Sequence, residues 1–134
     1  MSIKVLDINR DYVEIPIVNG GQAKAIIWPG MGAKNCALHY VVMKPGQENI
    51  PHVHQESEDI IFVIQGKGVV VDLDHGKEYP FGPGSVIYIP PGIRHTVKSY
   101  GPEDYIVVGA QSPFDLDLYK RAGLLKEGNE KESK

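Results

Sequence analysis

Hydrophobic positions along this chain are gathered in short runs, and polar residues separate one run from the next. Most runs are rich in valine, isoleucine, tyrosine or phenylalanine. Glycine, proline, asparagine or aspartate bounds them, as is typical of an all-β sandwich or barrel. The runs therefore predict strands, which are expected at Val13–Val18, Ala23–Trp28, Cys36–Lys44, Ile50–His54, Asp59–Gln65, Val69–Leu73, Val86–Ile89, His95–Ser99 and Tyr105–Gln111.

The segments between the runs have the chemistry of turns. The stretches WPGMG, KPGQ, QGKG, DLDHGKEYPFGPG and PPGIR each supply a proline with a fixed φ or a glycine that tolerates positive φ. No tandem repeat or internal linker interrupts the 134 residues, a length suited to one compact domain. We therefore expect a single domain over residues 1–125, followed by a charged tail at 126–134.

One segment near the end of the chain has a helical pattern. In SPFDLDLYKRAGLL, Ser112 can cap a helix, Pro113 suits the first helical position and Gly123 suits the stop. The final KEGNEKESK is charged and has no apolar residue, so we expect it to be disordered. The predicted fold is all-β with one short C-terminal helix.

Composition narrows the classes of function. Hydrophobic residues make up 42% of the chain and charged residues 23%, as in an ordinary soluble protein. The net charge of -3 lacks the basic footprint of a nucleic-acid partner, and no run approaches the roughly 20 apolar residues that span a membrane. The single cysteine, Cys36, cannot form an internal disulfide, so we expect a reducing, cytoplasmic location with Cys36 as a small buried residue.

Candidate chemistry is concentrated in PHVHQESEDIIFVIQG, residues 51–66. In a strand, His52 and His54 project to the same side, so their rings can converge on one point. Imidazole nitrogen suits Zn, Cu, Fe and Ni, and a carboxylate oxygen widens the choice towards Mn and Fe. Asp59 directly precedes the apolar run IIFVIQG, where a negative charge is costly unless it is paired or bound to a metal.

The spacing of this segment resembles a known motif. Gly46, His52, His54, Asp59 and Gly66 follow one another with five, one, four and six intervening residues. This arrangement is similar to the first motif of the cupin superfamily.

A second segment, GPGSVIYIPPGIRHTVKS, resembles the second cupin motif. Gly84, Pro90, Gly92 and His95 are separated by five, one and two residues. The resemblance implies a jelly-roll β-sandwich closed into a small barrel, with a divalent transition metal inside it (Fe, Mn, Zn, Ni, Co or Cu). The ligands that it implies are His52, His54, Asp59 and His95.

The chain departs from the cupin pattern at two positions. The usual carboxylate is glutamate, and Asp59 is one methylene shorter. Glu58 could replace it only if the strand register shifted by one residue, so we favour Asp59. Alternatively, three histidines hold the ion and Asp59 orients a ligand or a water. Ser99 stands where the second motif usually ends in asparagine.

Other polar and aromatic residues are candidates for the same site. His75 lies in a turn and is expected to be exposed, and Arg94 is expected at the rim or the surface. His39 either lines the pocket or belongs to a bonded interior. Five aromatic residues could form part of the pocket wall, although we expect each of them to belong to the core or the rim. They are Trp28, Tyr40, Tyr88, Tyr100 and Tyr105.

The resemblance implies several functions, because cupins include dioxygenases and other oxidoreductases, decarboxylases, isomerases, lyases and simple binding proteins. We expect a metal-dependent enzyme acting on a small oxygen-rich or dicarbonyl-type molecule, with no general base assigned. The alternatives are a non-catalytic binding module and a vestigial site in an assembly protein. A homodimer is expected, in which sheets pair and the segment YVEIPIV adds to a neighbour's edge.

Overall fold

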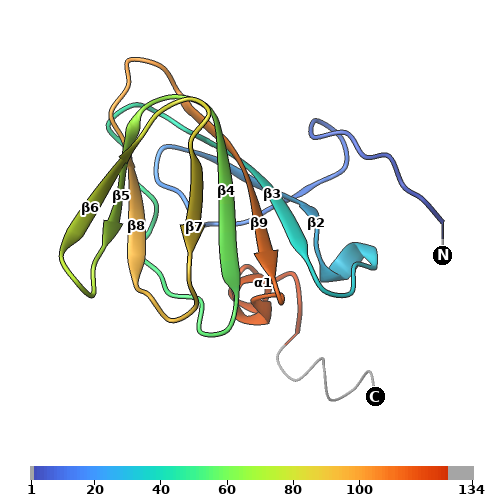
Figure 1. Ribbon diagram of the computed structural model, residues 1–134. Coiled ribbons are helices and arrows are strands. Elements are labelled where there is room, and N and C mark those ends of the chain that lie inside the picture. Colours follow the sequence, from blue (N-terminus) through green and yellow to red (C-terminus); the bar gives the residue numbers. More distant parts are fainter. Residues whose placement is uncertain (1, 127–134) are drawn as a thin grey trace.

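The computed structural model describes residues 2–126. Two antiparallel sheets form a sandwich with one short helix, as Figure 1 shows, and this confirms the predicted all-β fold. The predicted disordered tail lies outside the described residues, apart from Lys126. The described helices include none long and apolar enough to cross a membrane.

The larger sheet has six strands in the order β1-β2-β3-β9-β4-β7, and the smaller has three in the order β6-β5-β8. The last strand, β9, lies between β3 and β4 at the centre of the larger sheet. The elements are β1 (Val13–Glu14), β2 (Gly21–Ile27), the 3-10 helix η1 (Pro29–Met31), β3 (Ala37–Met43), β4 (Glu58–Gln65), β5 (Gly68–Asp72), β6 (Lys77–Phe81), β7 (Val86–Ile89), β8 (His95–Ser99), β9 (Tyr105–Ser112) and α1 (Leu116–Arg121).

Several predicted strands differ from the structure, and of the predicted strand Val13–Val18 only Val13–Glu14 forms, as β1. Ile50–His54 is not a strand, because Pro51 has no N–H to donate, and only His52 forms an isolated bridge, with His95. β6 lies where a long turn was expected, since four of its five residues are exposed and leave no apolar pattern. Pro80 is tolerated there because β6 is an edge strand.

The helix begins later than predicted. Ser112 ends β9, and Asp115 is the residue that precedes the first helical turn, so the expected cap at Ser112 is wrong. Gly123 follows the helix with a φ of 76°, which suits the predicted stop. Cys36 is exposed rather than buried, because it precedes β3 and has the opposite parity to the inward-facing row that begins at Ala37.

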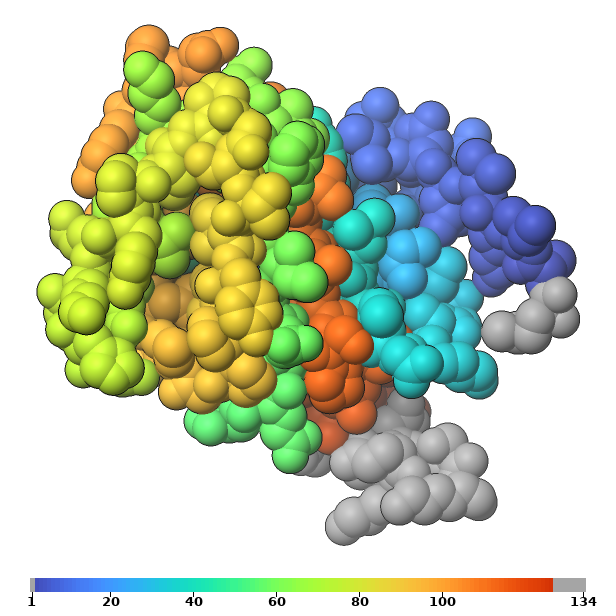
Figure 2. All heavy atoms as spheres, viewed as in Figure 1, coloured from blue at the N-terminus to red at the C-terminus, as the bar shows by residue number. Residues whose placement is uncertain are grey.

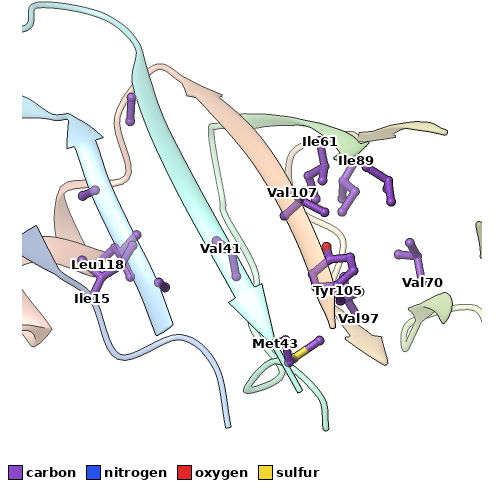
Figure 3. Close-up of a cluster of buried hydrophobic side chains, with 14 of the residues drawn as sticks. Ile15, Val41, Met43, Ile61, Val70, Ile89, Val97, Tyr105, Val107 and Leu118 are labelled. Atoms are coloured by element: carbon purple, nitrogen blue, oxygen red, sulfur yellow. The ribbon is translucent and has the colours of Figure 1, made fainter. Parts of the chain in front are cut away.

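The core lies between the two sheets and becomes polar towards one end. Figure 3 shows apolar side chains that include Tyr105 and Val107 of β9, with Ile61 and Val97 close by. At one end of the sheet, the inward-facing residues of β3, β9 and β4 are apolar, as at Met43, Tyr105 and Val63. At the other end, the inward positions of these three strands are polar: His39, Gln111 and Asp59. This polar end is where the candidate site lies.

Candidate metal centre

The four residues singled out in the sequence lie together at the polar end of the core. His52, His54, Asp59 and His95 each offer a ligand atom, and these atoms all lie within 4.8 Å of one another. His52 and His54 come from the loop before β4, while Asp59 and His95 stand near the starts of β4 and β8. The loop is held to β8 because His52 and His95 exchange two backbone hydrogen bonds, of 3.0 and 2.9 Å.

Each histidine is oriented by a hydrogen bond at its Nδ1 atom. His52 Nδ1 lies 2.8 Å from the carbonyl oxygen of Ile50, and His95 Nδ1 lies 2.9 Å from that of Ile93. A carbonyl oxygen can only accept, so in both rings Nδ1 donates and, in the neutral ring, Nε2 keeps its lone pair. This tautomer is the one in which Nε2 can bind a metal ion.

His54 is held differently, by a side chain far along the chain. Its Nδ1 lies 2.6 Å from Oδ2 of Asp115, which is 61 residues away and directly precedes α1. Burial alone would raise the pKa of Asp115, but the hydrogen bond with His54, assisted by the backbone N–H of Leu118 and the charge of Arg121, holds that pKa below its ordinary value. Asp115 is therefore an anionic acceptor, which fixes the tautomer of His54 and increases the basicity of its Nε2.

Asp59 is the carboxylate that enters the cluster. Its Oδ2 lies 3.7 Å from His54 Nε2 and 3.9 Å from His95 Nε2. Burial raises the pKa of Asp59 to about 6, and the nearby His54 opposes this shift. Glu58, the alternative, points to the outer face of β4 and accepts a hydrogen bond of 2.5 Å from the Tyr88 hydroxyl.

Burial also keeps two of the imidazoles uncharged. It lowers the pKa of His52 to about 4, with a further contribution from His95, and it lowers the pKa of His95. At neutral pH both rings are therefore neutral, which is the form that a metal ion binds. The cluster combines three imidazole nitrogens with one carboxylate oxygen.

The cluster opens into a cavity of about 250 Å³. Its walls are largely apolar and include Ile61, Val107 and Leu118. His39 also lines it and forms a 2.8 Å hydrogen bond with the Tyr119 hydroxyl, so both expectations for His39 hold: it faces the cavity and it is a bonded interior residue. Burial lowers the pKa of His39 to about 4.

The remaining predicted positions lie away from the cluster or in the wall. His75 is exposed and bonded to Asp72, and Arg94 is exposed, as expected for both. Among the aromatic residues, Tyr105 lines the cavity, whereas Trp28 packs against Tyr119 with ring centroids 5.7 Å apart. The others, half-buried or exposed, are Tyr40, Tyr88 and Tyr100.

Three polar residues of the site were not predicted. Gln111 lies 3.1 Å from His54 Nε2 through its own Nε2, Asp115 holds the opposite side of the same ring, and Asn49 lines the cavity. The alternation along the last strand could have placed Gln111 on the inner face. Asp115 and Asn49 lie in irregular segments, where no periodicity indicates the direction of a side chain.

Comparison with known proteins adds independent findings. Residues 39–109, more than half of the chain, match the family model described as Cupin domain. The polyketide synthase CurC of Streptomyces cyaneus is 29% identical over 114 residues, which cover 84% of this chain and 71% of that protein. An L-ectoine synthase of Rhodococcus erythropolis is 32% identical over 95 residues, covering 71% and 69% respectively.

Solved structures have the same fold. The polyketide cyclase RemF from Streptomyces resistomycificus superposes with a TM-score of 0.67 at 24% identity, over 91% of this chain and 94% of that one. A Cupin 2 conserved barrel domain protein from Salinispora arenicola gives a TM-score of 0.61 at 25% identity, over 92% and 96%.

Proposed function

The chain belongs to the cupin domain family, and from this premise we propose that it is a metal-dependent enzyme acting on a small oxygen-rich molecule. The observation that carries the proposal is the cluster of His52, His54, Asp59 and His95, whose ligand atoms lie within 4.8 Å of one another at the end of a cavity. These four residues would hold the ion.

The donor set fits a divalent transition metal. Three imidazoles have their Nδ1 atoms engaged by fixed acceptors, which leaves three Nε2 lone pairs for the ion. Imidazole and carboxylate together suit Mn, Fe, Co, Ni, Zn and Cu. Asp59 is buried beside two of these nitrogens, and a bound cation would stabilise its carboxylate there.

The protein's own residues prepare the site for a small ligand. Ile61, Val107 and Leu118 exclude water from the cavity, which strengthens every polar interaction inside it. A volume of about 250 Å³ lies below the usual range for drug-sized ligands, so the substrate is small. When bound, the metal supplies a Lewis acid and a template for substrate oxygen atoms.

The relatives support catalysis. Proteins named polyketide synthase and L-ectoine synthase share about 30% of the aligned residues with this chain, and a polyketide cyclase shares its fold. Synthases and cyclases form or rearrange bonds in organic molecules. These names favour an enzyme over a binding module.

A non-catalytic binding module is the second candidate. Among the described residues of the cavity, the titratable side chains outside the cluster are His39, Tyr105 and Arg121. His39 is bonded to Tyr119, and Arg121 pairs with Asp117 at 3.1 Å, so no obvious general base is left. A binding module would be stabilised by its ligand without converting it, whereas the enzyme would show turnover once loaded with metal.

Elemental analysis of protein purified without added metal tests the site itself. We expect about one transition-metal ion per chain in the wild type and almost none in His52→Ala. His75→Ala is the matched control, because His75 is an exposed histidine outside the cluster. A full metal complement in His52→Ala would contradict the assignment of these ligands.

We also propose a homodimer. The outer faces of β4 and β7 lie on the side that faces the viewer in Figure 2, and large apolar residues are exposed there. They are Ile60, Phe62, Ile64, Val86 and Tyr88. Such a contiguous apolar face is typical of a protein interface. Light scattering on the purified protein gives the mass directly.

A further inference from the structure

Gln111 occupies a special position beside the candidate metal centre. It lies on β9 directly opposite Asp59 of β4, and its side chain is buried, with only 5% of the residue exposed. It lines the cavity, and its Nε2 lies 3.1 Å from Nε2 of His54. Its Oε1 has no hydrogen-bond partner. One end of this amide thus touches a proposed metal ligand, and the other is an unused acceptor.

The hydrogen bond between Gln111 and His54 depends on a free lone pair. The amide nitrogen of Gln111 can only donate, so at 3.1 Å Nε2 of His54 accepts through its lone pair, while Nδ1 of His54 faces Asp115. A nitrogen lone pair that binds an ion cannot also accept this hydrogen bond. With the site loaded, the buried amide of Gln111 therefore has a released N–H in addition to its unused oxygen.

A second unused acceptor lines the same cavity. Asn49 is 9% exposed, and its Oδ1 has no hydrogen-bond partner. Its backbone is fixed, since its N–H donates to Val97 and its carbonyl accepts from the Thr96 hydroxyl. A buried acceptor without a donor is costly unless a ligand supplies one. The two amides therefore call for a ligand that donates hydrogen bonds.

The charges of the cavity limit the ligand further. Of the described residues that line it, Arg121 alone carries a fixed positive charge. The Arg121 side chain is 61% exposed and is paired with Asp117. A dianion would thus find no buried cation beyond the ion itself, and it would lie close to Asp59.

We propose that Gln111, with Asn49, selects a small hydroxyl-bearing ligand of at most one negative charge, such as a hydroxy acid, an enol or a phenol. The inference rests on the proposed function, because it needs the Nε2 atom of His54 to be engaged by an ion. The hydroxyl donates to Oε1 of Gln111, Oδ1 of Asn49 is a second acceptor in the same cavity, and the released N–H of Gln111 donates to a neighbouring ligand oxygen. A methyl ether of the same ligand lacks the donor.

The test uses the full chain loaded with Co²⁺, whose visible absorption reports both metal binding and ligand binding. Glycolate and methoxyacetate are the probes, since both present a carboxylate and only glycolate has a hydroxyl to donate. We expect wild-type protein to bind glycolate more tightly than methoxyacetate. Gln111→Met should weaken glycolate by about tenfold, the scale of one buried hydrogen bond, and should weaken methoxyacetate less, because methoxyacetate can accept from the Gln111 N–H but cannot donate to Oε1.

The controls separate this inference from the proposed function. Gln22→Met changes a glutamine of β2 that pairs with Glu14 outside the cavity, and it should bind both probes like the wild type. An intact cobalt band with equal glycolate affinity in wild type and Gln111→Met would overturn the inference alone. Absence of the band in wild-type protein would overturn the proposed function and, with it, the inference. Were Gln111→Met not to fold, equal affinity of the wild type for the two probes would still overturn the inference.

Discussion

The two faces of the larger sheet depart from the usual pattern in opposite directions, and β4 shows both departures in one strand. Its inward row is Asp59, Ile61 and Val63, so a carboxylate that is 8% exposed begins an otherwise apolar row. Its outward row leaves Ile60, Phe62 and Ile64 47%, 49% and 46% exposed. A charged group is buried on one face while large apolar groups meet solvent on the other.

The reason for each departure lies in the residues beside it. The inward carboxylate lies beside Gln111, two histidine nitrogens and a cavity. The outward row lies beside Val86 and Tyr88 of β7, which are themselves exposed. Burying a charge and exposing apolar surface both cost free energy. The first departure supports the proposed cation on the inner face, and the second supports the proposed protein contact on the outer face.

The largest difference between the two faces is expected when one imidazole of the inner face is removed. We expect His54→Ala to weaken metal binding by more than about a hundredfold, because it removes a proposed ligand as well as the partner of Asp115. Competition with a chromophoric chelator measures the affinity. Phe62→Lys, on the outer face, should bind metal like the wild type. Equal losses in the two variants would show that the faces are not independent.

The inner face should also make stability depend on pH. Burial holds the pKa of His39 at about 4, below its unfolded value of 6.5, so the unfolded chain takes up the proton first as the pH falls. The contribution of His39 to the free energy of unfolding is therefore fully present above pH 6.5 and is lost as the pH falls towards 4. The loss is on the order of 3 kcal/mol.

Urea unfolding of metal-free protein at pH 7 and pH 4.5 measures this loss. His39→Gln, which stays neutral and can still accept from the Tyr119 hydroxyl, should lose less stability between the two values. His75→Gln, at an exposed turn, should behave like the wild type. Identical pH dependence in all three proteins would contradict the buried neutral state of His39.

Asp115→Asn tests the support of the inner face rather than its ligands. The substitution removes the charge that accepts from His54 Nδ1, and we expect metal affinity to fall by about tenfold to a hundredfold. Asp117→Asn, two residues on and 72% exposed at its side chain, is the matched control and should change affinity little. Wild-type affinity in Asp115→Asn would show that the carboxylate does not tune the site.

The smallest change in free energy is expected on the outer face. Phe62→Lys should alter the stability of the fold by no more than about 0.5 kcal/mol, because Phe62 is half exposed. It should nevertheless convert the proposed homodimer to a monomer in light scattering, since it places a charge in the apolar face. A mass equal to that of the wild type would place the contact elsewhere.

Sequence predicted the fold and the four clustered residues because their signals are local. Spacing in the two motifs was sufficient for His52, His54 and His95, even though the predicted strand at Ile50–His54 did not form, and strand parity favoured Asp59 over Glu58. β6 was missed because an edge strand exposes most of its residues and has no apolar row.

The residues that support the cluster depend on long-range contacts. The bond from His54 to Asp115 joins an irregular loop to the start of a helix, and neither segment has a period that orients its side chains. Likewise, the sequence could not predict whether the outward apolar residues of β4 are buried or exposed, because they belong to a continuous apolar run. Such a run can be buried on both faces or on only one.

The place of β9 has a consequence for how the protein folds. This strand follows β4 to β8 in the sequence, yet it lies between β3 and β4 and so unites the two halves of the larger sheet. Asp115, which bonds to His54, follows β9 in turn. The larger sheet is therefore complete, and His54 gains its carboxylate partner, only when contacts form between segments far apart in the sequence, which is the kind of contact that slows folding.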